Sequence, residues 1–248
     1  VAELIAINAA TTGTPVLNAA TNAANFSDTA ANLTAGFLGT TSHTGTLTVT
    51  GAAATVAQAN LLDAITQGVV TATIEGDSAA DLATLTGTTG VYTVVQNGTV
   101  VATIAELIAI NAATTGGITI NSNTIANNYS NGAAALAAAF TGITTHTGTM
   151  TISGTTAATE AELLVINAAT AGAITLNAQT IAANYSESAA NLVLMFDGTI
   201  TEHTGVLTIS GATAATVALL IKINLATTGT LVLNAATNAA NFSDTAAN

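Results

Sequence analysis

Apolar and polar positions alternate along short, β-branched segments that glycines bound. Residues 117–121 (GITIN) and 149–153 (TMTIS) are clear cases. Alternation with a period of two places every second side chain on one face of a sheet, so such segments predict β-strands. Nine segments share this pattern: 15–18, 47–50, 69–74, 91–95, 117–121, 149–153, 173–177, 207–210 and 231–234.

Alanine-rich segments with helical signals lie between the predicted strands. In 103–116, Thr103 and Glu106 have the spacing of a capping box, apolar side chains follow, and Gly116 ends the segment. Helices this short are unstable alone in water, so each must pack on a sheet. The same interpretation applies to 56–67, 78–81, 126–141 and 159–172.

The phrases themselves recur. ELIAIN at 3–8 returns at 106–111 and, as ELLVIN, at 162–167, while HTG begins at His43, His146 and His203. These intervals define a 57-residue unit. We predict units at about 104–160 and 161–217, and an insert with the same strand–helix pattern at about 56–101.

A longer repeat contains these units. Residues 217–248 match 1–32 at 28 of 32 positions, at an offset of 216 residues. Repeats share one continuous core without internal boundaries. The sequence therefore predicts one continuous repeat array over 1–248, which we expect to be a fragment of a longer chain.

A strand, a short helix and another strand form a crossover whose strands pair in parallel and whose hand is right in nearly every case. We therefore predict an α/β solenoid that is right-handed, with a single parallel β-sheet, short helices or helical turns on the opposite wall, and about nine coils. An all-β right-handed parallel β-solenoid is the alternative, should the alanine-rich segments be extended.

Charge narrows the choice of partners. The chain has 13 acidic residues, a single cation at Lys222 and a net charge of −12. Binding to nucleic acid needs clustered Lys and Arg, so that class is excluded. No run of eighteen apolar residues exists, so no membrane span is expected. Cysteine is absent, which excludes disulfides and thiolate metal sites.

Asparagines recur at fixed places in the repeat. Asparagine at an equivalent turn can hydrogen-bond the backbone of neighbouring segments, and this is the role that we predict for them. One set ends the ELIAIN-like phrases and another ends predicted strands. These positions are Asn8, Asn111, Asn167 and Asn224, and Asn18, Asn121, Asn177 and Asn234.

A third set of asparagines lies in N-[FY]-S phrases, which match the acceptor pattern for N-glycosylation. We favour a turn asparagine beside an aromatic side chain that fills the core, and leave glycosylation open. The asparagines are Asn25, Asn128, Asn184 and Asn241, and the aromatic residues are Phe26, Tyr129, Tyr185 and Phe242.

The three histidines of the HTG phrases invite a metal site, but zinc ligands must converge within about 2 Å of one ion. His43, His146 and His203 are spaced too far along the repeat, so we predict solvated or capping histidines. Acids at Asp28, Glu187 and Asp244 precede helical segments, where they favour the helix N-terminus. Calcium is kept as an alternative ligand of these acids.

No catalytic motif is present, so we predict no enzyme and assign no catalytic, cofactor-binding or metal-binding residue. Residues 57–95, with LLDAITQGVVTATIEG and SAADLATLTG, resemble repeats of giant cyanobacterial cell-surface and extracellular "beta strand repeat" proteins. These include the swimming-associated surface protein of marine cyanobacteria. The resemblance implies a secreted or surface-anchored structural array without an active site.

We therefore expect a structural repeat segment of a very large secreted protein, located outside the cell or on its surface. Stacked coils would self-associate into a filament, a surface layer or a fibre. The alternative is an adhesin that binds glycans on a solenoid scaffold. That alternative requires exposed aromatic side chains that depart from the repeat, and Tyr92 is its candidate.

Overall fold

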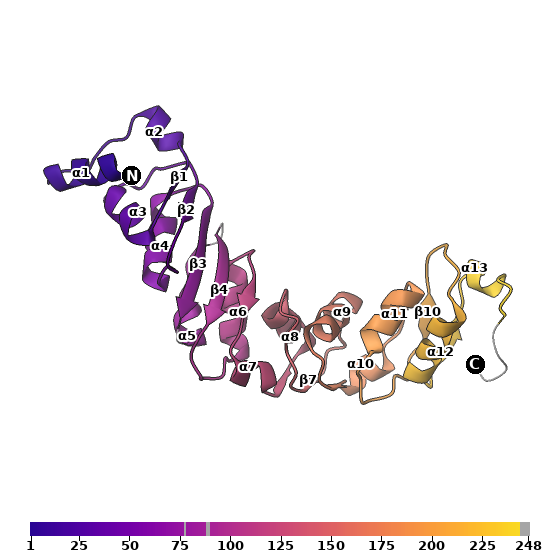
Figure 1. The fold of residues 1–248 in the computed structure, drawn as a ribbon. Helices are drawn as coiled ribbons and strands as arrows, with labels where there is room; N and C mark the ends of the chain where they lie inside the picture. Colours follow the sequence, from indigo (N-terminus) through magenta and orange to yellow (C-terminus); the bar gives the residue numbers. More distant parts are fainter. Residues whose placement is uncertain (77, 88–89, 244–248) are drawn as a thin grey trace. The chain divides into compact units, whose positions relative to one another are not determined.

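The computed structural model describes residues 1–76, 78–87 and 90–243, so the predicted helix-terminal acid Asp244 lies outside the described residues. The chain divides into two compact units, Val1–Thr124 and Ile125–Asn248. Each unit combines short helices with parallel strands (Figure 1). The α/β class with parallel strands is thus confirmed, while the continuous array over 1–248 stays a prediction.

The first unit holds one five-stranded parallel sheet in the order β1-β2-β3-β4-β5. Its strands are β1 Phe26–Asp28, β2 Leu47–Val49, β3 Val70–Gly76, β4 Val91–Gln96 and β5 Ile118–Thr119. Its helices are α1 Ala2–Ala10, α2 Ala19–Ala23, α3 Ala30–Gly36, α4 Val56–Ile65, α5 Ala79–Leu82 and α6 Ile104–Ala113, with α7 Ser122–Ala126 at the boundary between the units.

The second unit holds two three-stranded parallel sheets, in the orders β6-β7-β8 and β11-β10-β9. The strands are β6 Tyr129–Asn131, β7 Met150–Ile152, β8 Ile174–Thr175, β9 Tyr185–Glu187, β10 Leu207–Ile209 and β11 Leu231–Val232. The helices are α8 Ala133–Phe140, α9 Glu160–Ala169, α10 Ala178–Ala182, α11 Ala189–Phe196, α12 Val217–Ala226 and α13 Ala235–Asn238.

The prediction of a single sheet is wrong, because the described residues form three sheets. In the second unit β8 is the last strand of its sheet. The helix α10 follows β8 in the chain, and the next strand, β9, belongs to a separate sheet. The far edge of β8 pairs with a loop instead. The Ile174 amide donates to the Gly198 carbonyl (3.1 Å), and the Ile200 amide donates to the Ile174 carbonyl (2.9 Å).

The all-β alternative is also wrong, because the alanine-rich segments are helical. In α6 the Thr103 hydroxyl accepts from the Glu106 amide (3.2 Å), and the Glu106 carboxylate accepts from the Thr103 amide (2.7 Å). These reciprocal bonds satisfy two amides that a helix start leaves unpaired. The predicted box at Thr159 and Glu162 forms as well.

Eight of the nine predicted strands contain a strand, and residues 15–18 do not. The equivalent strands β5, β8 and β11 each pair with a strand 24 residues earlier. Residues 15–18 pair with no strand among the described residues, and Pro15 has no amide hydrogen to donate. A strand requires a partner, so the pattern alone was insufficient.

Three strands were missed: β1, β6 and β9 in the N-[FY]-S phrases. The prediction of one helical segment at 126–141 is therefore wrong, since Tyr129–Asn131 is extended and α8 begins only at Ala133. The expectation that the aromatic residue fills the core is confirmed at Tyr129 and Tyr185, which are buried. Phe26 is half-buried, and the expectation is wrong at Phe242, which is 46% exposed. The asparagine before each of these two tyrosines precedes a strand and does not form a turn.

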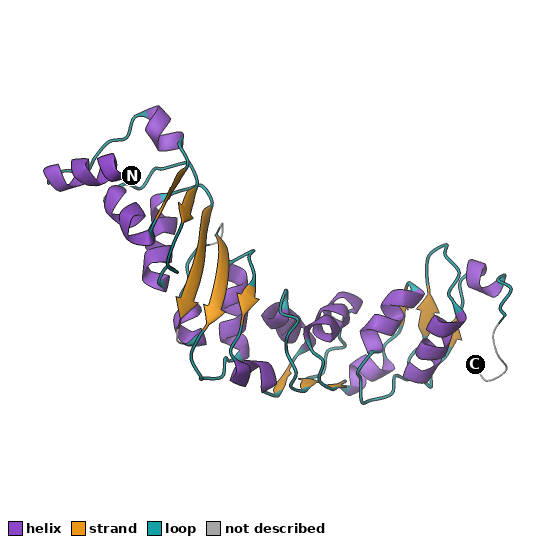
Figure 2. Cartoon of the chain, viewed as in Figure 1, coloured by secondary structure: helices purple, strands orange, loops and turns teal. Residues whose placement is uncertain are grey.

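The core lies between the strands and the helices that follow them. β3 alternates buried and exposed residues over its whole length, and α6 buries Leu107, Ile110 and Ala113 on one face. Each fully buried aliphatic side chain of this size contributes roughly 2 kcal/mol. Figure 2 shows the helices packed along the strands within each unit. In the part of the chain that is described, no helix has the length and apolar character needed to cross a bilayer.

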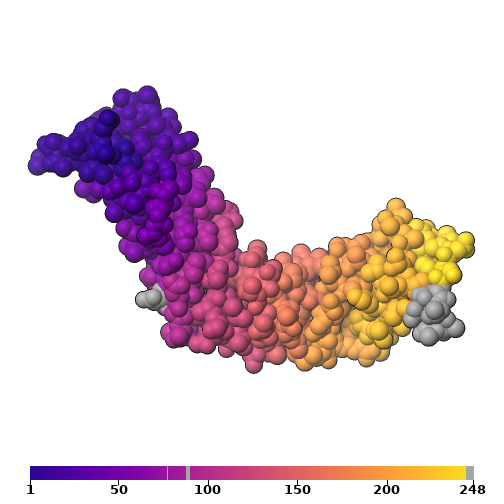
Figure 3. Space-filling model, in the orientation of Figure 1, coloured from indigo at the N-terminus to yellow at the C-terminus, as the bar shows by residue number. Residues whose placement is uncertain are grey.

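Segments that are close in sequence are also close in space. In the second unit α8 packs on α9, α9 on α11 and α11 on α12. In Figure 3 the colours of this unit follow one another in chain order. Each segment is therefore sheltered chiefly by the segments just before and just after it.

Candidate functional site: the contacts that recur between repeats

Three clusters of rings occupy equivalent places in the repeat. Each combines an aromatic residue on a strand, a phenylalanine at the end of the following helix, and the histidine of the HTG phrase. Ring centroids lie 4.8 to 5.8 Å apart, mostly at tilted or edge-on angles that aromatic pairs prefer. The clusters are Phe26–Phe37–His43, Tyr129–Phe140–His146 and Tyr185–Phe196–His203.

The predicted solvated or capping role of the histidines is wrong, because all three are fully buried. His146 Nε2 lies 2.9 Å from the Asn127 carbonyl oxygen, and His203 Nε2 lies 2.8 Å from that of Ala183. A carbonyl can only accept, so Nε2 carries the hydrogen in both. Their Nδ1 atoms face threonine hydroxyls of the next repeat, Thr170 (2.9 Å) and Thr227 (3.3 Å).

His43 lies in the same kind of cluster, yet its two ring nitrogens have no hydrogen-bond partner among the described residues. Burial lowers the pKa of His43 below the ordinary 6.5. Burial lowers the pKa of His146 and of His203 as well, and the bond from each ring to a carbonyl opposes part of that effect. The low dielectric surroundings favour the neutral ring in all three.

The histidines do not converge on a metal site. Each has its own aromatic cluster, and the described residues contain no group of three or more His, Cys, Asp or Glu side chains that could hold an ion. Asp28 accepts from the Thr29 amide and the Asn32 side chain, both at 2.8 Å, and these bonds lower the pKa of Asp28. Glu187 accepts equivalent bonds from Ser188 (3.1 Å) and Asn191 (3.0 Å), so both acids lie at helix starts as predicted.

The strand-end asparagines link neighbouring repeats, as predicted. Asn177 Oδ1 accepts from the Thr180 amide (2.9 Å), which caps α10. Asn177 Nδ2 donates to the carbonyls of Gly154 (3.1 Å) and Thr156 (2.9 Å) in the preceding repeat. Asn121 and Asn234 make the same two kinds of bond.

The other recurring asparagines also bind backbone. Asn8 donates to the carbonyls of Ala35 (3.1 Å) and Gly36 (2.6 Å), and Asn167 donates to that of Leu194. In the N-[FY]-S phrases the side-chain oxygen accepts from an amide 21 or 22 residues later in the chain. These amides are those of Thr46 (2.9 Å), Thr149 (2.9 Å) and Val206 (2.8 Å). The predicted backbone role is confirmed at Asn8 and Asn167, whereas the backbone bonds of the N-[FY]-S asparagines were not predicted.

Threonines form a second link that sequence reasoning missed. Thr124, Thr180 and Thr237 are fully buried, and their hydroxyls accept from the amides of Ala102 (3.0 Å), Ala158 (2.8 Å) and Ala215 (2.8 Å). Each bond spans 22 residues. These threonines end the phrase N-x-x-T at 121–124, 177–180 and 234–237. The same phrase also occurs at 8–11, 18–21, 111–114, 167–170 and 224–227, so it did not single them out.

Glycines allow the backbones of successive repeats to meet. A Cβ at Gly148 would overlap the Asn127 carbonyl, and a Cβ at Gly172 would overlap the Gly148 carbonyl. Thr170 helps to hold this approach, because its hydroxyl donates to the Gly148 carbonyl (3.0 Å) and accepts from the Gly172 amide (2.9 Å). The HTG phrase thus encodes close stacking, with glycine needed for space.

Tyr92 is buried in β4, so it is not the exposed aromatic side chain that a glycan-binding face needs. Burial raises the pKa of Tyr92 to about 12, and the nearby Asp63 carboxylate adds to the shift. Asp63 is itself affected, because burial raises the pKa of its carboxyl group. The interpretation of Tyr92 as a binding residue is therefore wrong.

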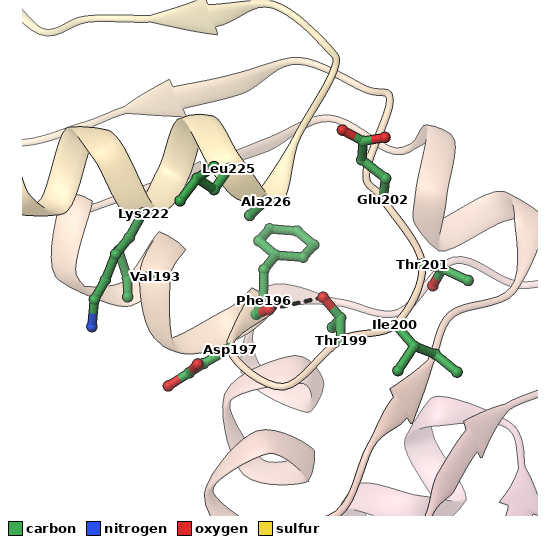
Figure 4. Close-up of a pocket in the computed structure, with 10 residues that line it drawn as sticks. All are labelled: Val193, Phe196, Asp197, Thr199, Ile200, Thr201, Glu202, Lys222, Leu225 and Ala226. Carbon is green, nitrogen blue, oxygen red and sulfur yellow. Dashed lines mark hydrogen bonds between the residues drawn. The ribbon is translucent and has the colours of Figure 1, made fainter. Parts of the chain in front are cut away.

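One hollow of about 380 Å³ lies between α11, the loop 197–202 and α12 (Figure 4). Carboxylates of Asp197 and Glu202 and the ammonium group of Lys222 line it, beside apolar side chains that include Ile200 and Leu225. Of the three hollows described, this is the one lined by groups of both charges as well as apolar side chains.

Comparison with known proteins gives no match to a family model, to a curated protein or to a solved structure.

Proposed function

We propose that the chain is a structural repeat segment of a very large secreted protein, in which coils stack as a right-handed α/β solenoid. The observation that carries this proposal is the bond from a buried threonine hydroxyl to an amide 22 residues earlier, repeated at Thr124, Thr180 and Thr237. In each case the threonine hydroxyl satisfies an amide that would otherwise be buried without a partner, and the two residues are always 22 positions apart. Coils linked in this way can be added one after another.

The remaining contacts support a mechanical role. Asparagine links and glycine contacts join segments a little over 20 residues apart, and each ring cluster joins residues within one such segment. All of these contacts use neutral groups. Neutral links are insensitive to salt, which suits an assembly exposed to a changing medium. The proposal assigns no catalytic residue and no cofactor to the chain.

The resemblance of residues 57–95 to cyanobacterial surface repeats supports an extracellular or cell-surface location, and self-association of the stacked coils would build a filament, a surface layer or a fibre. Antibodies raised against the chain should label intact source cells or material shed from them. Labelling only after the cells are opened would contradict the location.

The alternative function, an adhesin that binds glycans, finds less support. Tyr92, Tyr129 and Tyr185 are the tyrosines of the chain, and all three are buried. Glycan-binding faces use exposed aromatic and amide groups, whereas the amides of Asn25, Asn128 and Asn184 already accept backbone bonds. Binding of the folded chain to an array of glycans would favour this alternative.

Stacking is tested with chains that contain one, two or three tandem copies of residues 1–216, joined in the natural register. Small-angle X-ray scattering should show a maximum dimension that grows in proportion to copy number. The urea midpoint should rise and then level off. A dimension that grows only as the cube root of copy number would mean compact packing. Matched chains that lack residues 1–10 of each later copy break the register, and should lose the rise in midpoint.

A further inference from the structure

Helix α12 departs from the repeat to which it belongs. Residues 217–248 differ from 1–32 at four positions, and three of these lie on α12: Leu219, Lys222 and Leu225. The equivalent residues of α1 are glutamate, alanine and alanine. Residues three apart on a helix are neighbours on its surface. The substitutions therefore change one face of α12.

The segment that packs on α12 departs as well. Six residues separate Phe196 from His203, whereas five separate the equivalent residues in each earlier cluster. Leu194 of α11 stands where α3 and α8 have Ala35 and Ala138. The longer loop also carries the acids Asp197 and Glu202 on its exposed side.

These two departures meet at one surface. Figure 4 shows the Phe196 ring in the centre, with Leu225 of α12 above it. The side chains of Lys222 and Asp197 lie on one side of the ring, and Glu202 lies on the other. The one hydrogen bond drawn there joins the Thr199 hydroxyl to the Phe196 carbonyl (2.8 Å). No hydrogen bond or ion pair is drawn between the three charged side chains.

The added apolar groups are largely exposed among the described residues. Leu194, Ile200 and Leu225 are 54%, 65% and 75% exposed. At two of these positions the equivalent repeats carry alanine, which leaves the same fold without an exposed leucine. Ile200 and Leu225 line the same hollow, whereas Leu194 lines a hollow on the α9 side of α11. Large apolar groups that cluster on the surface, as Ile200 and Leu225 do, mark interaction sites. This cluster, rimmed by charge, has the composition of a protein interface.

Charge identifies the partner as a second copy of the chain. With 13 acidic residues and one cation, two copies repel each other, and Lys222 is the single side-chain cation with which they can form an ion pair. Lys222, Asp197 and Glu202 line the same hollow, with Glu202 across the Phe196 ring from Lys222. A two-fold axis would bring Lys222 of each copy to the acids of the other, as an isologous interface requires.

We propose that the α11–α12 patch, defined as Asp197, Ile200, Glu202, Lys222 and Leu225, pairs with the same patch of a second copy. Such pairing would join two arrays side by side. It rests on the proposed function, because it supplies the lateral self-association, but the stacking of coils does not depend on it. A patch of a few side chains gives a weak, reversible contact. A polymer repeats this contact along its length, which strengthens the association.

Sedimentation equilibrium of the 248-residue chain over a range of concentrations tests the pairing. Lys222→Glu and, separately, Leu225→Ala should each raise the dimer Kd at least about tenfold, while the far-UV circular dichroism stays unchanged. Alanine is the residue of the equivalent helices, so folding is preserved. Val16→Thr is the matched control: Val16 is 96% exposed outside the patch, Thr119 and Thr175 are its equivalents, and the Kd should not change.

A charge exchange completes the test. Lys222→Glu and the double variant Asp197→Lys, Glu202→Lys should each be monomeric alone. Their mixture should form a heterodimer, because one set of ion pairs is then restored with reversed sign and the other set is the wild-type one. The proposal is overturned if the wild-type chain stays monomeric at the highest concentration, if the patch variants associate as the wild type does, or if the mixture stays monomeric. If the maximum dimension of the tandem chains still grows in proportion to copy number, the proposed stacking of coils holds even when the proposed pairing fails.

Discussion

The imidazole Nε2 of His146 lies 2.9 Å from the carbonyl oxygen of Asn127, 19 residues earlier in the chain. The same relationship joins His203 to Ala183 at 2.8 Å. A titratable ring thus closes a buried contact between successive repeats, at a place where its neighbours are two aromatic rings and a threonine hydroxyl.

Acid should therefore weaken the fold. Burial lowers the pKa of His43, His146 and His203 from 6.5, so below about pH 6.5 the unfolded chain binds more protons than the folded chain. The contribution of the neutral rings is complete above that pH and is lost as the pH falls toward the folded-state pKa. The urea midpoint should be lower at about pH 5 than at about pH 7.5.

The control replaces all three histidines with glutamine, which hydrogen-bonds but does not titrate. That variant should show a smaller change in midpoint over the same interval. Asp28 does not interfere, because its pKa is lowered from 3.8 and its effect appears only at more acidic pH. An unchanged pH dependence in the glutamine variant would contradict the assignment to histidine.

Thr180→Val should destabilise the second unit by about 1–3 kcal/mol, because the Ala158 amide would be left buried without an acceptor. Valine has nearly the shape of threonine, so packing is retained. Thr155→Val, at an exposed position, is the control and should change the free energy of unfolding by less than about 0.5 kcal/mol. Urea titration followed by circular dichroism measures both.

Asn177 allows its two roles to be separated. Asn177→Asp keeps the acceptor for the Thr180 amide but loses the donors to Gly154 and Thr156, whereas Asn177→Ala loses all three bonds. The alanine variant should lose about 1 kcal/mol more than the aspartate variant, which is the usual effect of an N-cap. Equal losses in chemical denaturation would show that the cap contributes nothing measurable.

Gly172→Ala should cost about 3 kcal/mol or more, since the new methyl group meets the Gly148 carbonyl and the backbones must separate. Gly132→Ala is the matched control, because nothing lies within 4 Å of its added Cβ and its φ is −60°. The difference between their thermal midpoints measures the effect of the close approach. Similar midpoints would mean that the backbones separate freely.

Local signals were predicted well because they act over a few residues. The Thr103–Glu106 and Thr159–Glu162 capping boxes depend on groups three residues apart, so the sequence contains both partners. The histidines were misjudged because their burial depends on rings from other elements. For His146 these are Tyr129 on β6 and Phe140 on α8, and no pattern next to His146 reveals them.

The candidate surface shows the same division. Comparison of α12 with α1 in the sequence alone reveals Lys222 and Leu225 as departures, but their meeting with Asp197 depends on the packing of α12 on α11. The sequence contained the unusual residues, and the structure showed that they share one surface.

The sequence by itself determined the strand–helix alternation, the helix starts and the spacing of the repeat, because capping bonds and side-chain periodicity are properties of neighbouring residues. Only the tertiary structure decided where each ladder of strands ends, which polar side chains are buried, and which surface gathers the departures from the repeat. Those features depend on pairing between segments 20 or more residues apart, and the free energy of such pairing is set by the partner as much as by the segment itself.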